Sequence, residues 1–439
     1  MALTLTLAAF GAMFALMALR VPVAAAMFVP GAAAYWLLAG DGALLGQLKG
    51  AVWARFSNYE LSVIPLFLLM GQFASQGGLA RDLFRAANAG VGRLRGGMAM
   101  AAILACAAFG AICGSSVATA ATIGQVALPE MRRAGYSGRL ATATLAAGGT
   151  LGILIPPSVV LVVYAILAEQ NIGKLFAAAA IPGVIAAAGY LVAIAFYVRR
   201  HPEHAPAVVE TAERAEAAVW LRVWPVLAIF ALVFGGIYGG LFTPTEGAAV
   251  GAAATFAVAL LKGELDRAAL ARGLLGTAET TAMVFMIFIG ADMLNAALAL
   301  SQVPAEVARL IAGIDVPPLL VVVGILALYV MLGAVMDELA MIVLTIPVLF
   351  PAVMGLDLWG LAPAEKAIWF GILVLMVAEV GLIAPPVGLN VYVIHGLARD
   401  VPMRETYRGV LPFLASDAVR IALVLLFPAL SLFLVRATS

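Results

Sequence analysis

The sequence predicts an all-α protein that crosses a membrane many times and is built from an inverted repeat. Of its 439 residues, 64% are hydrophobic and 11% are charged, which lies far outside the composition of a water-soluble domain of this length. Inside a bilayer only α-helices and closed barrels satisfy their backbone hydrogen bonds, and these long apolar runs lack the alternation of barrel strands. At about 20 residues for each span, the chain offers about ten apolar stretches and several shorter, interrupted ones.

The charges exclude a nucleic-acid protein and orient the chain in the membrane. The net charge is +1, and the charged residues fall in short loops rather than on one basic face. With the N-terminus outside, most of the 25 Lys and Arg residues fall on the cytoplasmic side, as the positive-inside rule requires. We therefore expect a multi-pass inner-membrane protein of a bacterial cell with both termini in the periplasm. The basic residues that remain outside are Lys49, Arg55, Lys174, Arg309, Lys366 and Arg436.

A hydrophilic stretch at the centre divides the chain into two membrane halves. Residues 198–221 are rich in Pro, Glu and Ala, so we expect a cytoplasmic linker between a first half, 1–197, and a second half, 222–439. His201 and His204 lie in this stretch without cysteine or paired carboxylate partners. A solvated loop is therefore a better interpretation of the two histidines than a metal site.

Each half contains a polar or Gly-rich break followed by a Pro-Pro element. Ser115 in the first half precedes Asp337 in the second by 222 residues, and Pro156 precedes Pro385 by 229 residues. The nearly constant offset indicates an internal repeat with one short insertion. The matching segments are 113–124 and 148–158 in the first half and 336–347 and 379–390 in the second.

The flanking residues predict that the two polar breaks enter the membrane from opposite faces. Arginines precede and follow residues 97–131, so this segment should enter and leave on the cytoplasmic face as a re-entrant hairpin. Residues 317–351 form the matching hairpin, which starts and ends outside. A broken helix follows each hairpin, at 140–168 and at 367–397. Opposite entry faces for matching sequences are typical of an inverted repeat.

The Pro-Pro elements predict unpaired backbone carbonyl groups in the middle of the membrane. Two prolines in succession remove two backbone donors and clash with the preceding turn, so the helices should break near Pro156-Pro157 and Pro385-Pro386. Carbonyl groups freed in this way are tolerated only against protein or a cavity. They are hard oxygen ligands, which a desolvated Na⁺ can use.

The polar residues at the two hairpin tips differ in their chemistry. Ser115 and Ser116 bring hydroxyl oxygens to the first tip, where helix N-termini also attract an anionic group. Asp337 and Glu338 at the second tip need a cation, a proton or a cap, because an isolated charge at that depth costs at least about 2.5 kcal/mol. For Asp337, helix capping and ion coordination are equally open. Asn390 follows the second helix break, and we expect its amide to close an ion cage.

The order of these elements resembles the large membrane subunit of tripartite ATP-independent periplasmic (TRAP) transporters over essentially the whole chain. The segments that carry the resemblance are GSSVATAATIG, GGTLGILIPPS, MDELAMIVLTIPVLFP and GLIAPPVGLNVYV. The resemblance implies an elevator-type transporter with two re-entrant hairpins and two broken helices. It also implies an inward Na⁺ gradient as the energy source, a separate small membrane subunit, and a periplasmic binding protein that delivers an organic acid, for example a C4-dicarboxylate.

The resemblance further assigns residues to two Na⁺ sites and to substrate, with Na⁺ as the coupling ion and no covalent cofactor. The first Na⁺ site would comprise Ser115, Ser116, Gly149, Thr150 and Pro156. The second would comprise Asp337, Glu338, Gly381, Pro385 and Asn390. The substrate-binding residues would be Ser116, Thr119, Thr345, Pro157 and Pro386.

Other functions remain open at this point. A stand-alone Na⁺/anion symporter or antiporter of the same superfamily would share the repeat, and a passive channel would need no gradient. The sequence lacks a phosphate-binding Gly-x-x-x-x-Gly-Lys-Ser/Thr run, which argues against a built-in ATPase. It also lacks His-Glu-x-x-His and Gly-x-Ser-x-Gly motifs, so we do not expect an enzyme. The identity of the organic acid is not predicted.

Overall fold

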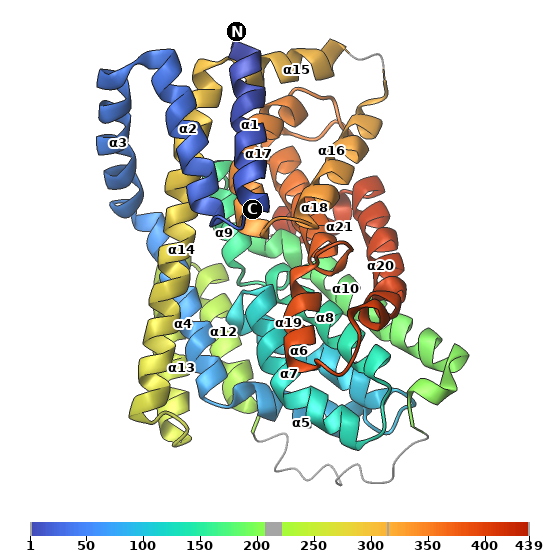
Figure 1. Ribbon diagram of the computed structural model, residues 1–439. Helices are drawn as coiled ribbons and strands as arrows, with labels where there is room; N and C mark the ends of the chain where they lie inside the picture. Colours follow the sequence, from blue (N-terminus) through green and yellow to red (C-terminus); the bar gives the residue numbers. More distant parts are fainter. Residues whose placement is uncertain (1, 207–221, 314–315, 438–439) are drawn as a thin grey trace.

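A computed structural model describes residues 2–206, 222–313 and 316–437, and within these ranges the regular structure is helical (Figure 1). The helices of the first half are α1 (Ala2–Ala18), α2 (Val23–Ala39), α3 (Asp41–Phe56), η1 (Tyr59–Ser62), α4 (Val63–Gln76), α5 (Leu79–Val91), α6 (Gly97–Cys113), α7 (Ser116–Arg133), α8 (Gly138–Leu154), α9 (Val159–Leu167), α10 (Ile172–Arg200) and η2 (Pro202–His204). Those of the second half are α12 (Trp224–Tyr238), α13 (Pro244–Leu261), α14 (Arg267–Leu300), α15 (Val303–Gly313), α16 (Pro318–Gly333), α17 (Glu338–Met354), α18 (Pro363–Ile383), α19 (Leu389–Leu397), α20 (Met403–Leu426) and α21 (Ala429–Ala437).

The helices differ in whether they can cross a bilayer alone. By length and composition, five of the described helices qualify, namely α10, α13, α14, α18 and α20, or up to seven if each of two bent pairs counts as one span. The bent pairs join the segment from η1 to α4 with α5, at 66°, and α8 with α9, at 43°. The sequence predicted about ten spans. Several apolar stretches instead form shorter helices, such as α12 with 15 residues, which is about 22 Å long.

The predicted linker only partly coincides with irregular structure. We expected it to begin at residue 198, but α10 continues to Arg200 and the short helix η2 follows at Pro202–His204. Residues 207–221, which make up most of the predicted linker, lie outside the described residues. Tyr197 on the last turns of α10 bonds to His204 of η2 at 2.7 Å, so the first residues of the predicted linker are folded against α10.

The longest described helix, α14, packs so closely against α2 that the backbones of the two helices are in contact. A Cβ atom added at Gly31 of α2 would lie 2.6 Å from the backbone nitrogen of Leu294, and one added at Gly290 of α14 would lie 2.3 Å from the carbonyl oxygen of Ala24. Glycine at these two positions therefore allows the close helix crossing that small residues provide in membranes. Figure 1 shows α14 along one side of the molecule, with α2 and α3 beside its upper part and α4 beside its lower part.

The centre of the molecule is formed by the two helices that precede the Pro-Pro elements. In α8 every side chain from Leu140 to Leu154 is buried, and in α18 nearly every residue is buried. The hairpin α6–α7 packs against α8, and the hairpin α16–α17 packs against α18. Figure 1 shows the first hairpin in the lower part of the molecule and the second in the upper part.

We predict that Gly290→Leu disrupts the packing of α2 on α14. The added side chain would overlap the backbone of Ala24, so the free energy of unfolding should fall by about 1–3 kcal/mol or more. The measurement is thermal unfolding in detergent. The matched control is Gly235→Leu in α12, where an added Cβ would meet nothing within 4 Å. Equal stability of the two variants would contradict the proposed close packing.

Candidate functional site

The two hairpin tips begin their second helices with matching caps. Ser115 is the N-cap of α7, and its Oγ accepts a hydrogen bond from the backbone nitrogen of Ala118 at 3.4 Å. Asp337 is the N-cap of α17, and its Oδ1 accepts from the backbone nitrogens of Leu339 and Ala340 at 3.0 and 3.4 Å. The side chain of Asp337 thus acts as a helix cap, which was one of its two open interpretations. Each tip presents a capped helix N-terminus, the end of a helix that attracts anions.

Glycines bring each hairpin into contact with the helix that precedes a Pro-Pro element. A Cβ atom added at Gly110 of α6 would lie 2.7 Å from Cα of Gly152 in α8. A Cβ atom added at Gly381 of α18 would lie 2.5 Å from the carbonyl carbon of Gly333 in α16. Both contacts join the first arm of a hairpin to an interrupted helix, so the two halves contain the same helix crossing. Substitution at either crossing would push the hairpin away from the break.

Both helices are interrupted where the Pro-Pro elements lie. In the first half α8 ends at Leu154 and α9 begins at Val159, and in the second half α18 ends at Ile383 and α19 begins at Leu389. The backbone nitrogen of Val159 donates to the carbonyl oxygen of Gly114 at 3.4 Å, which ties the first break to the first hairpin tip. The first break and the first tip therefore meet.

The two breaks differ in their surroundings. Pro156 and Pro157 are buried, whereas Pro385 and Pro386 are exposed. At the second break the hydroxyl of Tyr407, in α20, donates to the carbonyl oxygens of Pro386 and Val387 at 3.1 and 2.7 Å. The sequence analysis did not identify Tyr407, because it lies in another helix and outside the repeated segments. Carbonyl groups that we expected to be free at this break are thus held by a side chain.

Asn390 joins the second half of the chain to the first hairpin tip. Its Nδ2 donates to Oγ of Ser116 at 2.7 Å and to the carbonyl oxygen of Ala146 at 3.1 Å, and the residue is fully buried. A Cβ atom added at Gly149 would lie 2.9 Å from this Nδ2, so glycine there leaves room for the amide. The sequence grouped Asn390 with the second tip. The structure places it with the first, because α19 packs against α7 and α8.

Unpartnered oxygen atoms remain near the first tip. The Oδ1 of Asn390 and the Oγ1 of Thr119 are buried and accept no hydrogen bond within the described residues. Thr119 also adjoins the interrupted helix, since a Cβ atom added at Gly152 would lie 2.5 Å from its Oγ1 and 2.7 Å from the carbonyl oxygen of Ser115. Buried oxygens without donors, together with helix-break backbone, form the kind of donor set that suits a small hard cation.

The second tip offers carboxylate oxygen. Glu338 is 6% exposed, and its Oε2 has no hydrogen-bond partner in the part of the chain that the structure describes. Thr345, one of the expected substrate residues, uses its hydroxyl inside the hairpin, where it bonds to the hydroxyl of Tyr329 and to the carbonyl oxygen of Met341, both at 2.7 Å. Asp292 of α14 pairs with Arg55 of α3 at 2.5 Å. Glu338 therefore has free coordinating capacity at this tip.

A buried network of charged and polar groups connects the two interrupted helices. Arg420 of α20 donates through Nη2 to Glu379 of α18 at 2.7 Å and to Asp417 at 2.8 Å. The hydroxyl of Tyr190, in α10, donates to Asp417 at 2.9 Å and lies 3.1 Å from Oγ1 of Thr150 in α8. All five side chains are at most 2% exposed. Thr150, an expected Na⁺ ligand, is thus engaged in this network.

The sequence analysis missed this network, although a signal was available. Tyr190, Asp417 and Arg420 are polar or charged residues inside apolar stretches, which in membrane segments mark residues with specific partners. They lie outside the repeated motifs, and nothing in their spacing indicates that they meet Glu379.

We predict that Arg420→Leu strongly destabilises the protein. The substitution leaves two buried carboxylates without their cation, and breaking a buried ion pair in this way costs about 3–5 kcal/mol. The measurement is thermal unfolding in detergent. Arg436→Leu is the matched control, because it removes an exposed Arg–Glu pair, and exposed pairs contribute little to stability. Similar unfolding temperatures for the two variants would be inconsistent with a network that holds the interrupted helices together.

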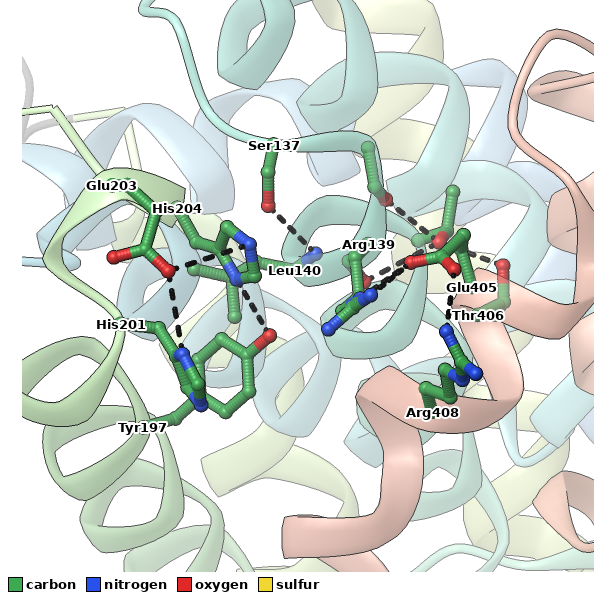
Figure 2. A network of polar contacts seen from close by, with 12 residues as sticks. Ser137, Arg139, Leu140, Tyr197, His201, Glu203, His204, Glu405, Thr406 and Arg408 are labelled. Carbon is green, nitrogen blue, oxygen red and sulfur yellow. Dashed lines mark hydrogen bonds and ion pairs between the residues drawn. The ribbon is translucent and has the colours of Figure 1, made fainter.

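A second polar network lies at the end of α10 (Figure 2). Arg139 donates to Glu405 at 2.6 Å, and Arg408 donates to the same carboxylate at 3.3 Å. On the other side of the network, Glu203 lies 3.3 Å from Nδ1 of His201 and 3.8 Å from Nε2 of His204. The pKa of Glu203 is lowered mainly by a hydrogen bond from its own backbone and to a smaller extent by the hydrogen bond from His201.

The carboxylate of Glu203 lies close to both His201 and His204. The sequence analysis had assigned no carboxylate partner to these two histidines. The possible ligand atoms of the two histidines and Glu203 lie within 4.8 Å of one another. His204 also bonds to Tyr197, and its partial burial lowers its pKa, so the neutral imidazole is favoured. These contacts fasten η2 to the end of α10, and the backbone of Ser137 adds a 3.0 Å hydrogen bond to the carbonyl oxygen of His204.

The fold and the site together define a class of protein, a multi-pass membrane permease in which interrupted helices meet hairpin tips. The same fold occurs in the crystal structure of the YdaH transporter of Alcanivorax borkumensis, with a TM-score of 0.60 and 15% sequence identity over 88% of this chain and 89% of that one.

The chain belongs to the DctM family, the DctM component of tripartite ATP-independent periplasmic transporters, whose family model matches residues 10–430. Among its relatives is the C4-dicarboxylate TRAP transporter large permease protein DctM of Pseudomonas aeruginosa, which is 36% identical over 85% of this chain and 86% of that protein. The sialic acid TRAP transporter large permease protein SiaM of Vibrio cholerae is 31% identical over 88% of each chain. The isethionate TRAP transporter permease protein DctMQ of Oleidesulfovibrio alaskensis is 30% identical over 97% of this chain, which spans 65% of the length of DctMQ.

Membership in this family confirms the resemblance on which the sequence analysis relied. The chain is a TRAP transporter large permease and a multi-pass membrane protein. The family implies that it works with a small membrane subunit and a periplasmic binding protein. The relatives are transporter permeases and not enzymes.

Proposed function

We propose that this chain is the large subunit of a Na⁺-coupled transporter that imports an organic acid across the bacterial inner membrane. The observation that carries the proposal is the meeting of hairpin tips and helix breaks around buried oxygens without hydrogen-bond donors. Oxygens of this kind are costly to bury and favourable for a cation that satisfies them. The termini would lie in the periplasm, where a binding protein delivers the substrate.

The first Na⁺ site would be formed by Ser115 and Ser116 of the first tip, Gly149, the backbone before Pro156, and Asn390. The free Oδ1 of Asn390 supports the addition of this residue to the first site, since its Nδ2 is already bound to Ser116. Thr150, which we expected here, is a weaker candidate because its hydroxyl bonds to Tyr190. The second site would be formed by Asp337, Glu338, Gly381 and Pro385, with the free Oε2 of Glu338 as its anionic ligand.

The substrate would be an anion held between the two tips. Three relatives are named for C4-dicarboxylate, sialic acid and isethionate, all of them acids. The N-termini of α7 and α17 supply backbone amides and positive dipole ends for such a group. Ser116, Thr119, Pro157 and Pro386 would line this position. Thr345 would act indirectly, by fixing the second hairpin.

Na⁺ binding and substrate binding would favour each other. A cation at Glu338 offsets a buried negative charge that would otherwise repel a carboxylate substrate. Thermodynamic linkage requires that the substrate then raises the affinity for Na⁺ by the same factor. The experiment is uptake of labelled acid into vesicles that contain the large and small subunits, with the purified binding protein outside. Accumulation should require both the binding protein and an inward Na⁺ gradient.

We predict that Ser115→Ala and Asn390→Ala weaken the dependence of uptake on Na⁺. Each change removes an oxygen from the first site, so the Na⁺ concentration for half-maximal uptake should rise about 5- to 150-fold, the effect of about 1–3 kcal/mol. Ser137→Ala is the matched control, because Ser137 caps α8 with the same geometry but lies outside the site. Wild-type Na⁺ dependence in both site variants would refute the assignment of the first site.

A substitution that preserves the capping hydrogen bonds of Asp337 can distinguish helix capping from Na⁺ coordination. Asp337→Asn retains an oxygen that can accept from the backbone of Leu339 and Ala340 but removes the negative charge. If the carboxylate also coordinates Na⁺, as we propose, the apparent Na⁺ affinity should fall at least about tenfold, since charged ligands contribute about 1.5–3 kcal/mol. Asp266→Asn at the N-cap of α14 is the control. Unchanged Na⁺ affinity in Asp337→Asn would leave capping as its role.

A further inference from the structure

A groove between α10 and α20 lies outside the site described above. Its volume is about 910 Å³, which is within the range of small-molecule sites. Apolar side chains form most of its walls and include Ile185, Val192, Phe196, Leu411, Val419 and Leu423. Val192, Phe196, Leu411 and Val419 are each more than half exposed, so the groove opens at the surface of the described structure. In a membrane protein such an opening faces hydrocarbon.

One end of the groove is basic. Arg139, Arg200, His201 and Arg408 line this end, and none of the described residues that line the groove is an aspartate or a glutamate. Arg139 and Arg408 share a single carboxylate, that of Glu405, which leaves one positive charge without an equal partner (Figure 2). The guanidinium of Arg200 lies 4.4 Å from the ring centre of Phe196, which places it over an apolar wall. The electrostatic potential at this end therefore favours an anionic group.

The length of the groove matches one leaflet of a bilayer. From Ile185 to Arg200, α10 rises about 22 Å at 1.5 Å for each residue. One leaflet comprises about 15 Å of hydrocarbon and about 5–7 Å of headgroup region. The basic end corresponds to the headgroup region and the apolar walls to the hydrocarbon. By the positive-inside rule this end lies at the cytoplasmic surface, where the linker between the halves begins.

We propose that this groove binds one anionic phospholipid of the cytoplasmic leaflet, with its phosphate between Arg200 and Arg408 and an acyl chain along α10 and α20. The basic end of the groove matches the charged headgroup of a phospholipid, and the apolar walls match its acyl chain. Basic pockets between membrane helices on the cytoplasmic side recognise such headgroups. An amphipathic helix of another protein would need acidic residues at the same end and is the alternative occupant.

We predict that purified protein retains anionic phospholipid through the groove. The full chain is reconstituted in vesicles of equal phosphatidylglycerol and phosphatidylethanolamine, extracted in mild detergent, and analysed by native mass spectrometry. The wild type should retain one phosphatidylglycerol in preference to phosphatidylethanolamine. The double variant Arg200→Gln/Arg408→Gln should bind it about 30-fold less tightly, since two basic contacts are lost.

Two further variants make the result decisive. Arg399→Gln/Arg404→Gln removes the same charge from exposed positions that do not line the groove and should retain the lipid like the wild type. Ala415→Trp fills the apolar part of the groove without changing the charge and should release the lipid. Equal retention by all variants, or equal retention of the two lipids by the wild type, would overturn the proposal. Release of phosphatidylglycerol by the Arg399 and Arg404 control to the same extent would overturn it as well, because it would indicate a diffuse charge effect.

Discussion

The arrangement of this permease depends on one constraint, which is that backbone groups freed inside a membrane must find partners without water. The Pro-Pro elements free such groups in α8–α9 and in α18–α19. At the first break the carbonyl oxygen of Gly114 accepts from Val159, so a hairpin tip supplies the partner. At the second, Tyr407 of α20 donates to two carbonyl oxygens. Each break is stable only with a neighbouring element in place, and the close glycine crossings of α6 with α8 and of α16 with α18 provide that proximity.

The elements around the site could be predicted from the sequence because each rests on local chemistry. Two adjacent prolines end a helix wherever they occur, and the 222-residue offset identified Ser115 and Asp337 as equivalent positions, both of which are N-caps. Contacts between halves could not be predicted in this way. The offset identifies equivalent positions in the two halves, but it does not say which helices of opposite halves pack together. The contact of Asn390 with Ser116 of the first tip was therefore not predicted. The contacts of Arg420 with Glu379 and of Asp417 with Tyr190 were hidden for the same reason, since they join α20 to α18 and to α10.

Two buried connections make the two halves of the chain a single unit at the site. In the first connection, the amide of Asn390 in α19 donates to Ser116 of the first tip. In the second, the network around Arg420 connects α18 and α20 with Tyr190 of α10, which in turn contacts Thr150 of α8. The first connection contributes to the site itself, while the second holds the helices on which the site is built. Replacing a buried ion network by apolar residues is often neutral for stability, so its value lies in fixing one arrangement of the helices. A fixed arrangement is what ion coordination requires, because a ligand displaced by about 1 Å loses much of its contribution.

The buried oxygens without hydrogen-bond partners determine which bound species would stabilise this arrangement. Each buried polar atom without a partner costs about 1–3 kcal/mol. Three such atoms belong to Thr119 and Asn390 near the first tip and to Glu338 at the second tip. A species that satisfies these atoms recovers the cost only in a conformation that keeps tips and breaks together. It therefore stabilises that conformation only by as much as it binds more tightly to that conformation than to others. Under the proposed function, a cation would satisfy these oxygens and reduce the negative charge near a carboxylate substrate. Each ligand would then raise the affinity for the other by the same factor.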